Sequence, residues 1–426
     1  MNILILNQDW FAVELREMGH HVVTAGLADH LDIKIDGPLL HIDSVIKNAM
    51  PQHSPDVIIV LDNSAPIVFL GLDETEVPTI FYSVDTHHHV ELHKYLANLF
   101  DYTLIAQKDY LPDFEAIGHH PEWMPLWASR HIEPSNDKRY QAVFVGTLNA
   151  KLNPDRVRFF DALKEKAPVH VQTGNFWELF PHAEVVVNQT VKGDLNFRVF
   201  EAMMSGAVLL TEASPNGLLE LFREGEHLVT YPKNDVDQAA EIIRGLLADP
   251  ARCRAIGASG RAEILARHTV HQRAQRIDQI VRTVKKKRSP QKLYSTMLNF
   301  ASLALKMEGI DTRLAGRTFL AALKAADYAV KEDEPLNEEL ACFVVLSCIN
   351  YERVINSGAA EALLEEIGQR HPNLEAIGLA RIRILLNSGR RNEAEVLARA
   401  LSADDVYDTF CRSDLFVESL LSLPFK

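Results

Sequence analysis

At 426 residues the chain is long enough to form two or three domains. Its formal net charge of −14 argues against a nucleic-acid partner, although a local site for an anionic ligand is compatible with that charge. There is no apolar run long enough to span a bilayer and no basic segment before the first apolar residues, so we expect a cytoplasmic protein without a transmembrane segment or signal peptide.

The chain opens with a strand, a helix and a second strand. Asn2 to Leu6 carries no charge and predicts a buried strand, a short helix ends at Gly19, and the next strand begins at His21. No glycine-rich loop follows the first strand. Trp10, which stands there instead, is interpreted either as a stacking platform for a ligand or as a core aromatic residue.

A histidine-rich helix follows a strand predicted at Thr79 to Val84, and its first two turns hold His87, His88, His89 and His93. Three interpretations are open. His89 and His93 have the spacing of two metal ligands, but no carboxylate partner supports a metal site. The histidines could instead face solvent. In the third interpretation, Asp85 with His87 or His88 lies in a cleft, where a histidine acts as a base or supplies positive charge.

The boundary between two α/β domains is predicted at the polar run from Ser129 to Arg139. After it, a strand from Tyr140 to Val145 leads into Gly146 and Thr147 and then into a helix from Pro154 to Lys164. A strand, a glycine-containing loop and a helix in this order form a turn that can face a phosphate.

The segment from Val185 to Glu220 gathers polar residues where two predicted strands end. Open parallel sheets bind ligands at that edge. Glu201 can accept two hydroxyl hydrogen bonds from a sugar diol, and Arg198 suits a diphosphate. Asn196 can donate and accept, and Gly217 frees backbone amides for an anion. The alternative is an ordinary exposed helix with an arginine and a glutamate three residues apart.

This segment resembles the donor-site motif of the GT-B glycosyltransferases, in particular the CgeB-like bacterial group named after a spore-maturation protein. The shared pattern runs N-x-R-x-F-E-A, then a small residue with glycine, then an apolar strand, and it is matched by Asn196, Arg198, Phe200, Glu201, Ala202 and Gly206. The wider retaining families have a second glutamate eight positions before the one that contacts ribose. Here Gly193 stands at that position, with Asp194 beside it. The resemblance covers about residues 1–285.

The resemblance implies a GT-B fold, with an acceptor-side Rossmann-like domain at 1–130 and a donor domain at 139–285 whose last helix, His271 to Val284, crosses back. It implies retaining transfer from a nucleotide-diphosphate sugar, with UDP favoured and the base open, to a hydroxyl of a protein or glycan. No metal or other cofactor is expected. A catalytically silent scaffold and a nucleotide-sugar epimerase are the alternatives.

CgeB-like proteins often carry an aspartate followed by histidine at a similar strand end, which favours the cleft interpretation. The residues expected in catalysis are Asp85, His87 and Arg198. Those expected at the donor are Gly146, Thr147, Asn196, Arg198, Glu201, Asn216 and Gly217. Those expected on the acceptor side are Trp10 and His88.

From Gln291 to the end there is no strand signal, and six helical patterns predict an all-α domain at 291–426. The stretches beginning at Asn356 and Asn387 have similar sequences, and this repeat resembles tetratricopeptide-type helical hairpins. Such a domain would dimerise the protein, bind a protein partner or cap the other domains. The basic run from Lys285 to Pro290 is interpreted as a solvated linker. The four cysteines lack metal-ligand spacing and suit a reducing compartment: Cys253, Cys342, Cys348 and Cys411.

Overall fold

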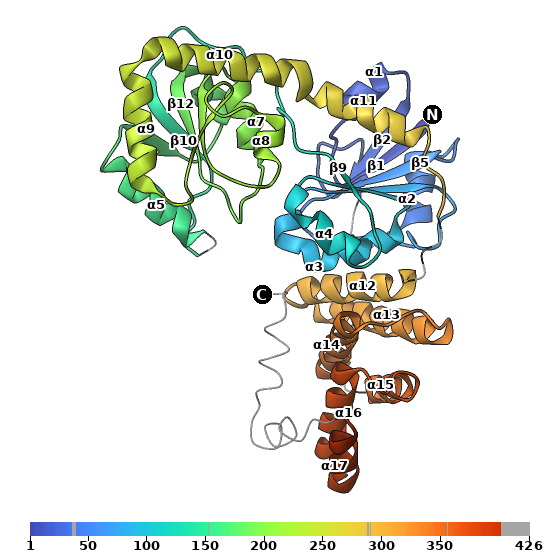
Figure 1. The fold of residues 1–426 in the computed structure, drawn as a ribbon. Helices are drawn as coiled ribbons and strands as arrows, with labels where there is room; N and C mark the ends of the chain where they lie inside the picture. The colour runs from blue at the N-terminus through green and yellow to red at the C-terminus, as the bar shows by residue number, and fades with distance from the viewer. Residues whose placement is uncertain (36–39, 152, 288, 290, 356, 402–426) are drawn as a thin grey trace.

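A computed structural model describes residues 1–401 except 36–39, 152, 288, 290 and 356. Two parallel α/β domains lie beside each other, and a stack of helices extends below the first (Figure 1). The end of the predicted helical domain, 402–426 with Cys411, lies outside the described residues. Within the described part, no helix is both long and apolar enough to cross a membrane.

The first sheet has seven parallel strands in the order β3-β2-β1-β5-β7-β8-β9. Every residue of β5 and β7 is buried, as expected for a parallel sheet covered on both faces. The strands are β1 (Asn2–Leu6), β2 (His21–Gly26), β3 (Ile33–Lys34), β5 (Val57–Leu61), β7 (Thr79–Ser83), β8 (Tyr102–Ile105) and β9 (Glu122–Trp123). The α-helices are α1 (Ala12–Glu17), α2 (Ile42–Ala49), α3 (Thr86–Leu96) and α4 (Leu111–Glu115), and a separate strand pair is formed by β4 (Leu40–His41) and β6 (Phe69–Leu70).

The second sheet has five parallel strands in the order β11-β10-β12-β13-β14. These are β10 (Tyr140–Val145), β11 (Val169–Gln172), β12 (Ala183–Asn188), β13 (Val208–Glu212) and β14 (Val229–Tyr231). The helices of this domain are α5 (Pro154–Lys164), α6 (Phe176–Leu179), α7 (Phe197–Met204), α8 (Leu218–Leu221), α9 (Val236–Ala248) and α10 (Pro250–Arg267). The carboxyl ends of β10 and β12 lead into the loops that carry the site residues described below.

Helix α11 (Val270–Val281) returns the chain to the first domain, where it packs against α1 (Figure 1). Arg273 holds this crossing in place: its Nε donates to the carbonyl of Pro125 at 2.6 Å and its Nη2 to that of Leu126 at 3.0 Å. His20 lies 2.6 Å from Asp278 of α11. Helix α11 is therefore fastened to the first domain by these contacts.

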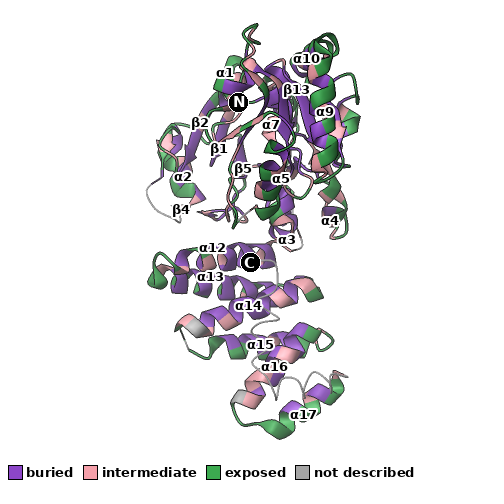
Figure 2. Ribbon diagram, turned by 90° about the vertical axis from the view of Figure 1, so that its left-hand side faces the viewer, coloured by how far each residue is buried: buried purple, intermediate pink, exposed green. Residues whose placement is uncertain are grey.

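The C-terminal helices form one hydrophobic core with the first domain. They are α12 (Lys292–Glu308), α13 (Thr312–Lys331), α14 (Glu338–Ile355), α15 (Ala359–Arg370), α16 (Glu375–Asn387) and α17 (Arg391–Ala400). A continuous cluster joins Val60 and Phe81 of the first sheet, through Tyr95 and Leu99, to Met297 and Phe319 of the helices. Helix α12 packs on α3 and is largely buried (Figure 2).

The predicted fold class is confirmed: two Rossmann-like α/β domains precede an all-helical region. The tetratricopeptide-like identity of the helices stays a prediction. Several short elements had no counterpart in the sequence patterns, among them α2, β9 and β14.

Candidate functional site

Two arginines of the second domain, Arg156, which is buried, and Arg198, which is half-buried, gather where its central strands end. Arg198 lies in the first turn of α7 and Arg156 in the first turn of α5. Their guanidinium groups lie over the ring of Phe144, at 4.5 and 5.7 Å from its centroid. Burial and the neighbouring charge of Arg156 lower the pKa of Arg198 to about 10. The pair concentrates positive charge at this edge of the sheet.

Neutral oxygens hold both guanidinium groups. Arg198 donates to the carbonyl of Val145 at 3.0 Å and to Oδ1 of Asn188 at 2.7 Å. Arg156 donates to Oε1 and to the carbonyl of Gln189, at 3.1 and 2.9 Å. Among the described residues, neither arginine forms an ion pair with a carboxylate. Because a buried charge without a counter-ion is costly, the pair is suited to an anionic ligand.

Gly146 leaves the space that Arg198 occupies. A Cβ atom at this position would lie 2.5 Å from Nη2 of Arg198 and 2.8 Å from the ring of Phe144. The glycine therefore acts by sterics, since any side chain would displace the guanidinium. Thr147, the next residue, is exposed.

Glu201 lies one turn after Arg198 in α7 and is 7% exposed. Burial raises the pKa of Glu201 to about 7, and Ser129, Arg198 and Arg130 oppose that shift. The Ser129 hydroxyl, which comes from the segment between the domains, donates to Oε1. Arg130 in turn stacks on the half-exposed ring of Trp177, with 4.2 Å between the guanidinium carbon and the ring centroid. A buried carboxylate beside a planar cation and an aromatic face suits a nucleoside.

A cavity of about 300 Å³ opens between the two domains and brings together several predicted residues, among them Trp10, Asp85, His87 and Asn196. On the side of the first domain it is lined by residues that follow β1, β5, β7 and β8. The carboxyl ends of parallel strands meet at one edge, which is why residues from distant parts of the chain meet here. The second domain contributes Asp194 and Phe197.

His87 lies in the first turn of α3 and is 6% exposed. Burial lowers its pKa, while Asp194 of the second domain and Asp85 of the first oppose that shift. Its Nδ1 has no hydrogen-bond partner among the described residues. The Oδ1 atom of Asn196 is also buried and has no hydrogen-bond partner among the described residues. Both residues line the cavity, and each has a buried polar atom with unused hydrogen-bonding capacity among the described residues.

Trp10 packs among aromatic residues at the contact between the domains, and its role as a stacking platform stays a prediction. Its ring packs edge-on against Trp127 at 5.5 Å and against Phe197 of the second domain at 5.9 Å. It is nevertheless half-buried and lines the cavity. Trp10 thus belongs to an aromatic contact between the domains and presents an edge to the site.

Three predicted site residues lie elsewhere. The side chain of Asn216 is engaged between the domains, donating to Oε1 of Gln107 at 2.6 Å and accepting from the amide of Asp109 at 3.0 Å. Gly217 lies against the ring of Trp123, so its lack of a side chain serves packing. His88 is exposed and does not line the cavity. The donor and acceptor roles of these residues stay predictions.

Sequence reasoning missed Arg156 and the engagement of Asp194. Asp194 is buried and accepts from the amide of Val191 at 2.5 Å. Its charge acts on Arg156, Arg198 and His87 together. The position of Arg156 was a signal in the sequence. A cation in the first turn of a helix is disfavoured by the helix dipole, so its presence there indicates a role other than stabilising the helix.

The two histidines with metal-ligand spacing are arranged differently from a metal site. His93 is buried, and its Nδ1 lies 2.7 Å from the hydroxyl of Ser83. His89 lies at a kink in α3, with its ring 5.4 Å from that of His93. Over the part of the chain that the structure describes, no group of three or more His, Cys, Asp or Glu side chains is placed to hold a metal ion.

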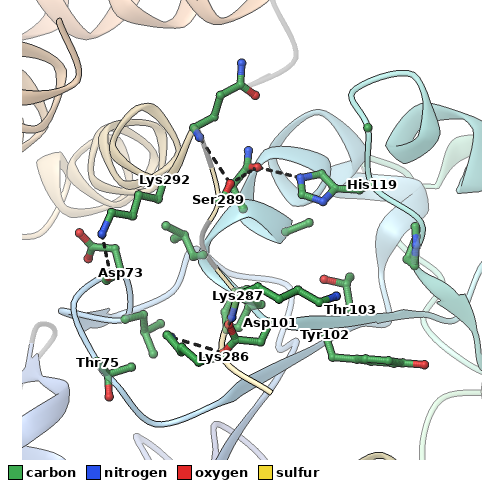
Figure 3. Close-up of a pocket in the computed structure, with 18 of the residues that line it drawn as sticks. Asp73, Thr75, Asp101, Tyr102, Thr103, His119, Lys286, Lys287, Ser289 and Lys292 are labelled. Carbon is green, nitrogen blue, oxygen red and sulfur yellow. Dashed lines mark hydrogen bonds and ion pairs between the residues drawn. The ribbon is translucent and has the colours of Figure 1, made fainter. Parts of the chain in front are cut away.

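A larger cavity, about 730 Å³, lies at the opposite edge of the first sheet, beside the linker to the helices (Figure 3). The buried carboxylate of Asp101 accepts from the amide of Lys287 at 2.6 Å and pairs with Lys286 at 3.3 Å. Lys292 donates to the carbonyl of Asp73 at 3.2 Å. Lys285, Lys286 and Lys287 are exposed, as expected for a solvated linker, and Asp101 in addition fastens the backbone of this linker to the domain.

Comparisons with known proteins agree with this architecture. Residues 129–279 match a family described as glycosyl transferase-like. Among solved structures, Anabaena HepE in complex with UDP and glucose is similar with a TM-score of 0.52 and 15% identity, over 67% of this chain and 100% of that one. Sucrose-phosphate synthase from Thermosynechococcus elongatus is similar with a TM-score of 0.52 and 14% identity, over 66% and 98%. No curated protein matches the sequence. The GT-B fold is confirmed by these structures.

Proposed function

We propose that the chain is a glycosyltransferase that takes a UDP-sugar and transfers the sugar to a hydroxyl group. The observation that carries the proposal is the pair Arg156 and Arg198, a buried and a half-buried cation whose hydrogen-bond partners are all neutral, within the segment that is glycosyl transferase-like. A diphosphate would supply the missing counter-charge. The complexes of HepE with UDP and with UDP-glucose favour uridine over other bases.

The donor would lie along the second domain. The ribose hydroxyls would donate to Glu201, and the diphosphate would lie against Arg156 and Arg198. The nucleobase would lie near the Arg130 and Trp177 pair, whose exposed aromatic face suits stacking. Asp194 and Asn196 would contact the sugar, since both line the cavity between the domains.

The acceptor would enter from the first domain, beside Trp10, Asp85 and His87. In the reaction the acceptor oxygen bonds to the anomeric carbon, the bond from that carbon to the diphosphate oxygen breaks, and UDP leaves with the bonding electrons. A neutral His87, favoured by its lowered pKa, can take the hydroxyl proton through its unpartnered Nδ1. The arginine pair would stabilise the charge on the leaving diphosphate.

The finer assignments are part of the same proposal. We place the chain in the CgeB-like group, with a retaining and metal-independent reaction, because arginine and backbone donors can replace a cation at the diphosphate. The hexose, the acceptor class and a cytoplasmic location follow the resemblance of the sequence.

Thermal unfolding in the presence of UDP, GDP, dTDP and CMP tests the proposal. A ligand at about a hundredfold excess over its Kd stabilises the native state by ~2.7 kcal/mol. We expect UDP to raise the Tm and Arg198→Gln to abolish the rise. Arg158→Gln is the matched control, because Arg158 is an exposed residue of α5 paired with Asp155.

Each other outcome would overturn part of the proposal. If no nucleotide raises the Tm of the unaltered protein, the donor pocket is wrong and a catalytically silent scaffold is favoured. If UDP-sugar is converted without any acceptor to an isomeric UDP-sugar, the protein is an epimerase.

A further inference from the structure

We propose that Asn299 of the helical region is a positioning residue for the acceptor side of the cavity, and that it acts through the loop between β5 and β6. The inference rests on the proposed function only for its consequence in activity. Its structural content, a fixed link from α12 to the cavity wall, can be tested by itself.

Asn299 is an amide side chain in the middle of α12, the helix that packs on the first domain. It is 3% exposed and shares the buried part of this helix with apolar residues such as Leu298 and with the hydroxyl residues Ser295, Thr296 and Ser302. Its Oδ1 accepts from the amide of Ile67 at 3.0 Å, and its Nδ2 donates to the carbonyl of Ile67 at 2.9 Å. The Asn299 side chain thus pairs with both the backbone N–H and the backbone C=O of Ile67, as a residue of a neighbouring antiparallel strand would.

Ile67 lies three residues after Ser64, in the same loop that lines the cavity. At the other end of this loop Asp62 accepts from the amides of Val84 and Asp85, at 3.0 and 2.8 Å. The Ser64 hydroxyl contacts the carboxylate of Asp85. The loop and the turn before α3 therefore form one hydrogen-bonded unit, and Asn299 fixes the end that faces away from the cavity.

A second contact from the helical region reaches the same wall through α3. Lys94 pairs with Glu339 of α14 at 2.7 Å, and the hydroxyl of Tyr95 donates to Glu339 at 2.8 Å. The first turn of α3 carries His87, and a kink at His89 separates it from these contacts. Because the kink weakens transmission along α3, the loop held by Asn299 is the more direct link to Asp85.

Replacing Asn299 by leucine keeps the volume and the apolar contacts but leaves the amide and carbonyl of Ile67 buried without partners. The loop must then shift or open to solvate them, and the shift reaches Ser64 and Asp85. The donor residues lie in the second domain, so their arrangement should not change.

Hydrogen–deuterium exchange of the full-length chain tests this link. In Asn299→Leu we expect exchange in residues 62–70 and 83–88 to become about tenfold faster, as expected when a net hydrogen bond is lost, with exchange in 185–205 unchanged. The matched control is Ser295→Ala, one turn away in α12, whose partner is Asn98 on the side of the linker. This control should leave residues 62–70 and 83–88 unchanged.

A folded Asn299→Leu protein with unchanged exchange in both segments would overturn the inference. If this variant does not fold, Asn299→Asp decides, since it keeps an acceptor for the amide of Ile67 and loses the donor to its carbonyl. Faster exchange in 62–70 then supports the inference, and unchanged exchange overturns it.

Enzyme kinetics distinguishes a positioning role of Asn299 from a general structural role. For UDP-sugar consumption, we expect Asn299→Leu to lower kcat while the KM for the donor stays within about twofold, because the altered wall faces the acceptor. If the unaltered chain neither binds UDP nor consumes UDP-sugar, the proposed function fails, but the exchange experiment still decides the role of Asn299.

Discussion

At the scale of single residues, the arginine pair predicts opposite effects on stability and on binding. Arg156 is buried and Arg198 half-buried, and neither forms an ion pair with a carboxylate among the described residues, so the pair costs stability until an anion binds. We expect Arg198→Met to leave the Tm of the ligand-free protein unchanged or raised, while its affinity for UDP falls by about tenfold or more. Calorimetric titration with UDP and thermal unfolding of the same samples measure both effects.

A structural arginine should behave differently, and Arg261 is the control. It donates to the carbonyls of Ile132 and Met204 and pairs with Glu133 at 2.9 Å. Arg261→Met should therefore lower the Tm without a specific effect on UDP. A fall in Tm for Arg198→Met as large as that for Arg261→Met would contradict a ligand-binding role for the pair.

The raised pKa of Glu201 predicts that UDP binds more tightly as the pH rises. A carboxylate accepts hydrogen bonds from two ribose hydroxyls with two charged oxygens, whereas a protonated carboxyl group is a weaker acceptor, and the pKa of about 7 places this change near neutrality. Between pH 6 and pH 8 the ionised fraction rises roughly tenfold, so the affinity should rise by a similar factor. Since the phosphates of UDP also titrate, the Glu201→Gln variant supplies the background slope, and equal slopes would contradict the assignment.

The same shift fixes the sign of a stability effect. A folded-state pKa above the ordinary value of 4.5 means that the protonated form is favoured in the native state. The contribution of Glu201 to the free energy of unfolding is therefore present in full below pH 4.5. It is lost as the pH rises through about 7, by an amount on the order of 3 kcal/mol. Urea unfolding of the ligand-free protein at pH 5 and pH 8, beside Glu201→Gln, measures it.

Part of this site was predictable because Arg198 and Glu201 lie in one short helix and Asn196 is its N-cap, so their proximity follows from spacing alone. Arg156, Ser129 and Asp194 join them only through the arrangement of strands and domains. No local pattern indicates that two guanidinium groups lie over the Phe144 ring, or that Ser129, in the segment between the domains, hydrogen-bonds Glu201.

At the scale of elements, α10 shows why glycines can lie inside a continuous helix. The helix runs without a break from Pro250 to Arg267. Gly257 and Gly260 lie in it because the backbone of Gly206 and of His227 approaches there. A Cβ atom at Gly260 would lie 2.5 Å from the carbonyl oxygen of His227, and one at Gly257 would overlap that of Gly206.

Two alanine substitutions test this explanation. Gly245→Ala in α9 meets no atom within 4 Å, so it should stabilise the protein by up to about 1 kcal/mol through helix propensity. Gly257→Ala gains the same propensity but must push α10 away from β13, so it should be destabilising, by about 1–3 kcal/mol. Equilibrium unfolding in urea compares the two, and a stabilising Gly257→Ala would show that the close approach is not required.

Elements with strong patterns were predictable because their apolar spacing is local. The strand Tyr140–Val145 and the helix Pro154–Lys164 have the boundaries that the sequence indicates. Strands of two or three residues, such as β9 and β14, form only because a neighbouring strand already offers its edge. Their existence is a property of the sheet and not of their own residues.

At the scale of the whole molecule, the helical region is part of the first domain's core instead of an appendage. The sequence indicates where the strands end and the all-helical region begins. It does not indicate whether these helices pack on the first domain or are only joined to it by a linker, because both kinds of helix have the same amphipathic pattern. The contacts with the first domain distinguish the two cases. Apolar side chains of both parts belong to one hydrophobic cluster there: Tyr95, Leu99 and Phe100 of the first domain with Met297 and Leu298 of α12.

This shared core predicts opposite behaviour of two shortened chains. A chain ending at residue 287 would expose the apolar surface that α12 covers and would lose the two hydrogen bonds from Asn299 to Ile67. We expect it to aggregate or to unfold at a lower temperature than the full chain, because each large side chain returned to water costs roughly 1.5–3 kcal/mol.

A chain ending at residue 355 keeps α12 to α14 and, with them, the contacts of Glu339 with Lys94 and Tyr95. It should keep a soluble first domain and its affinity for UDP. Size-exclusion chromatography and thermal unfolding with UDP compare the two, and a stable, monomeric 1–287 chain that binds UDP as the full chain does would mean that the helices are an appendage after all.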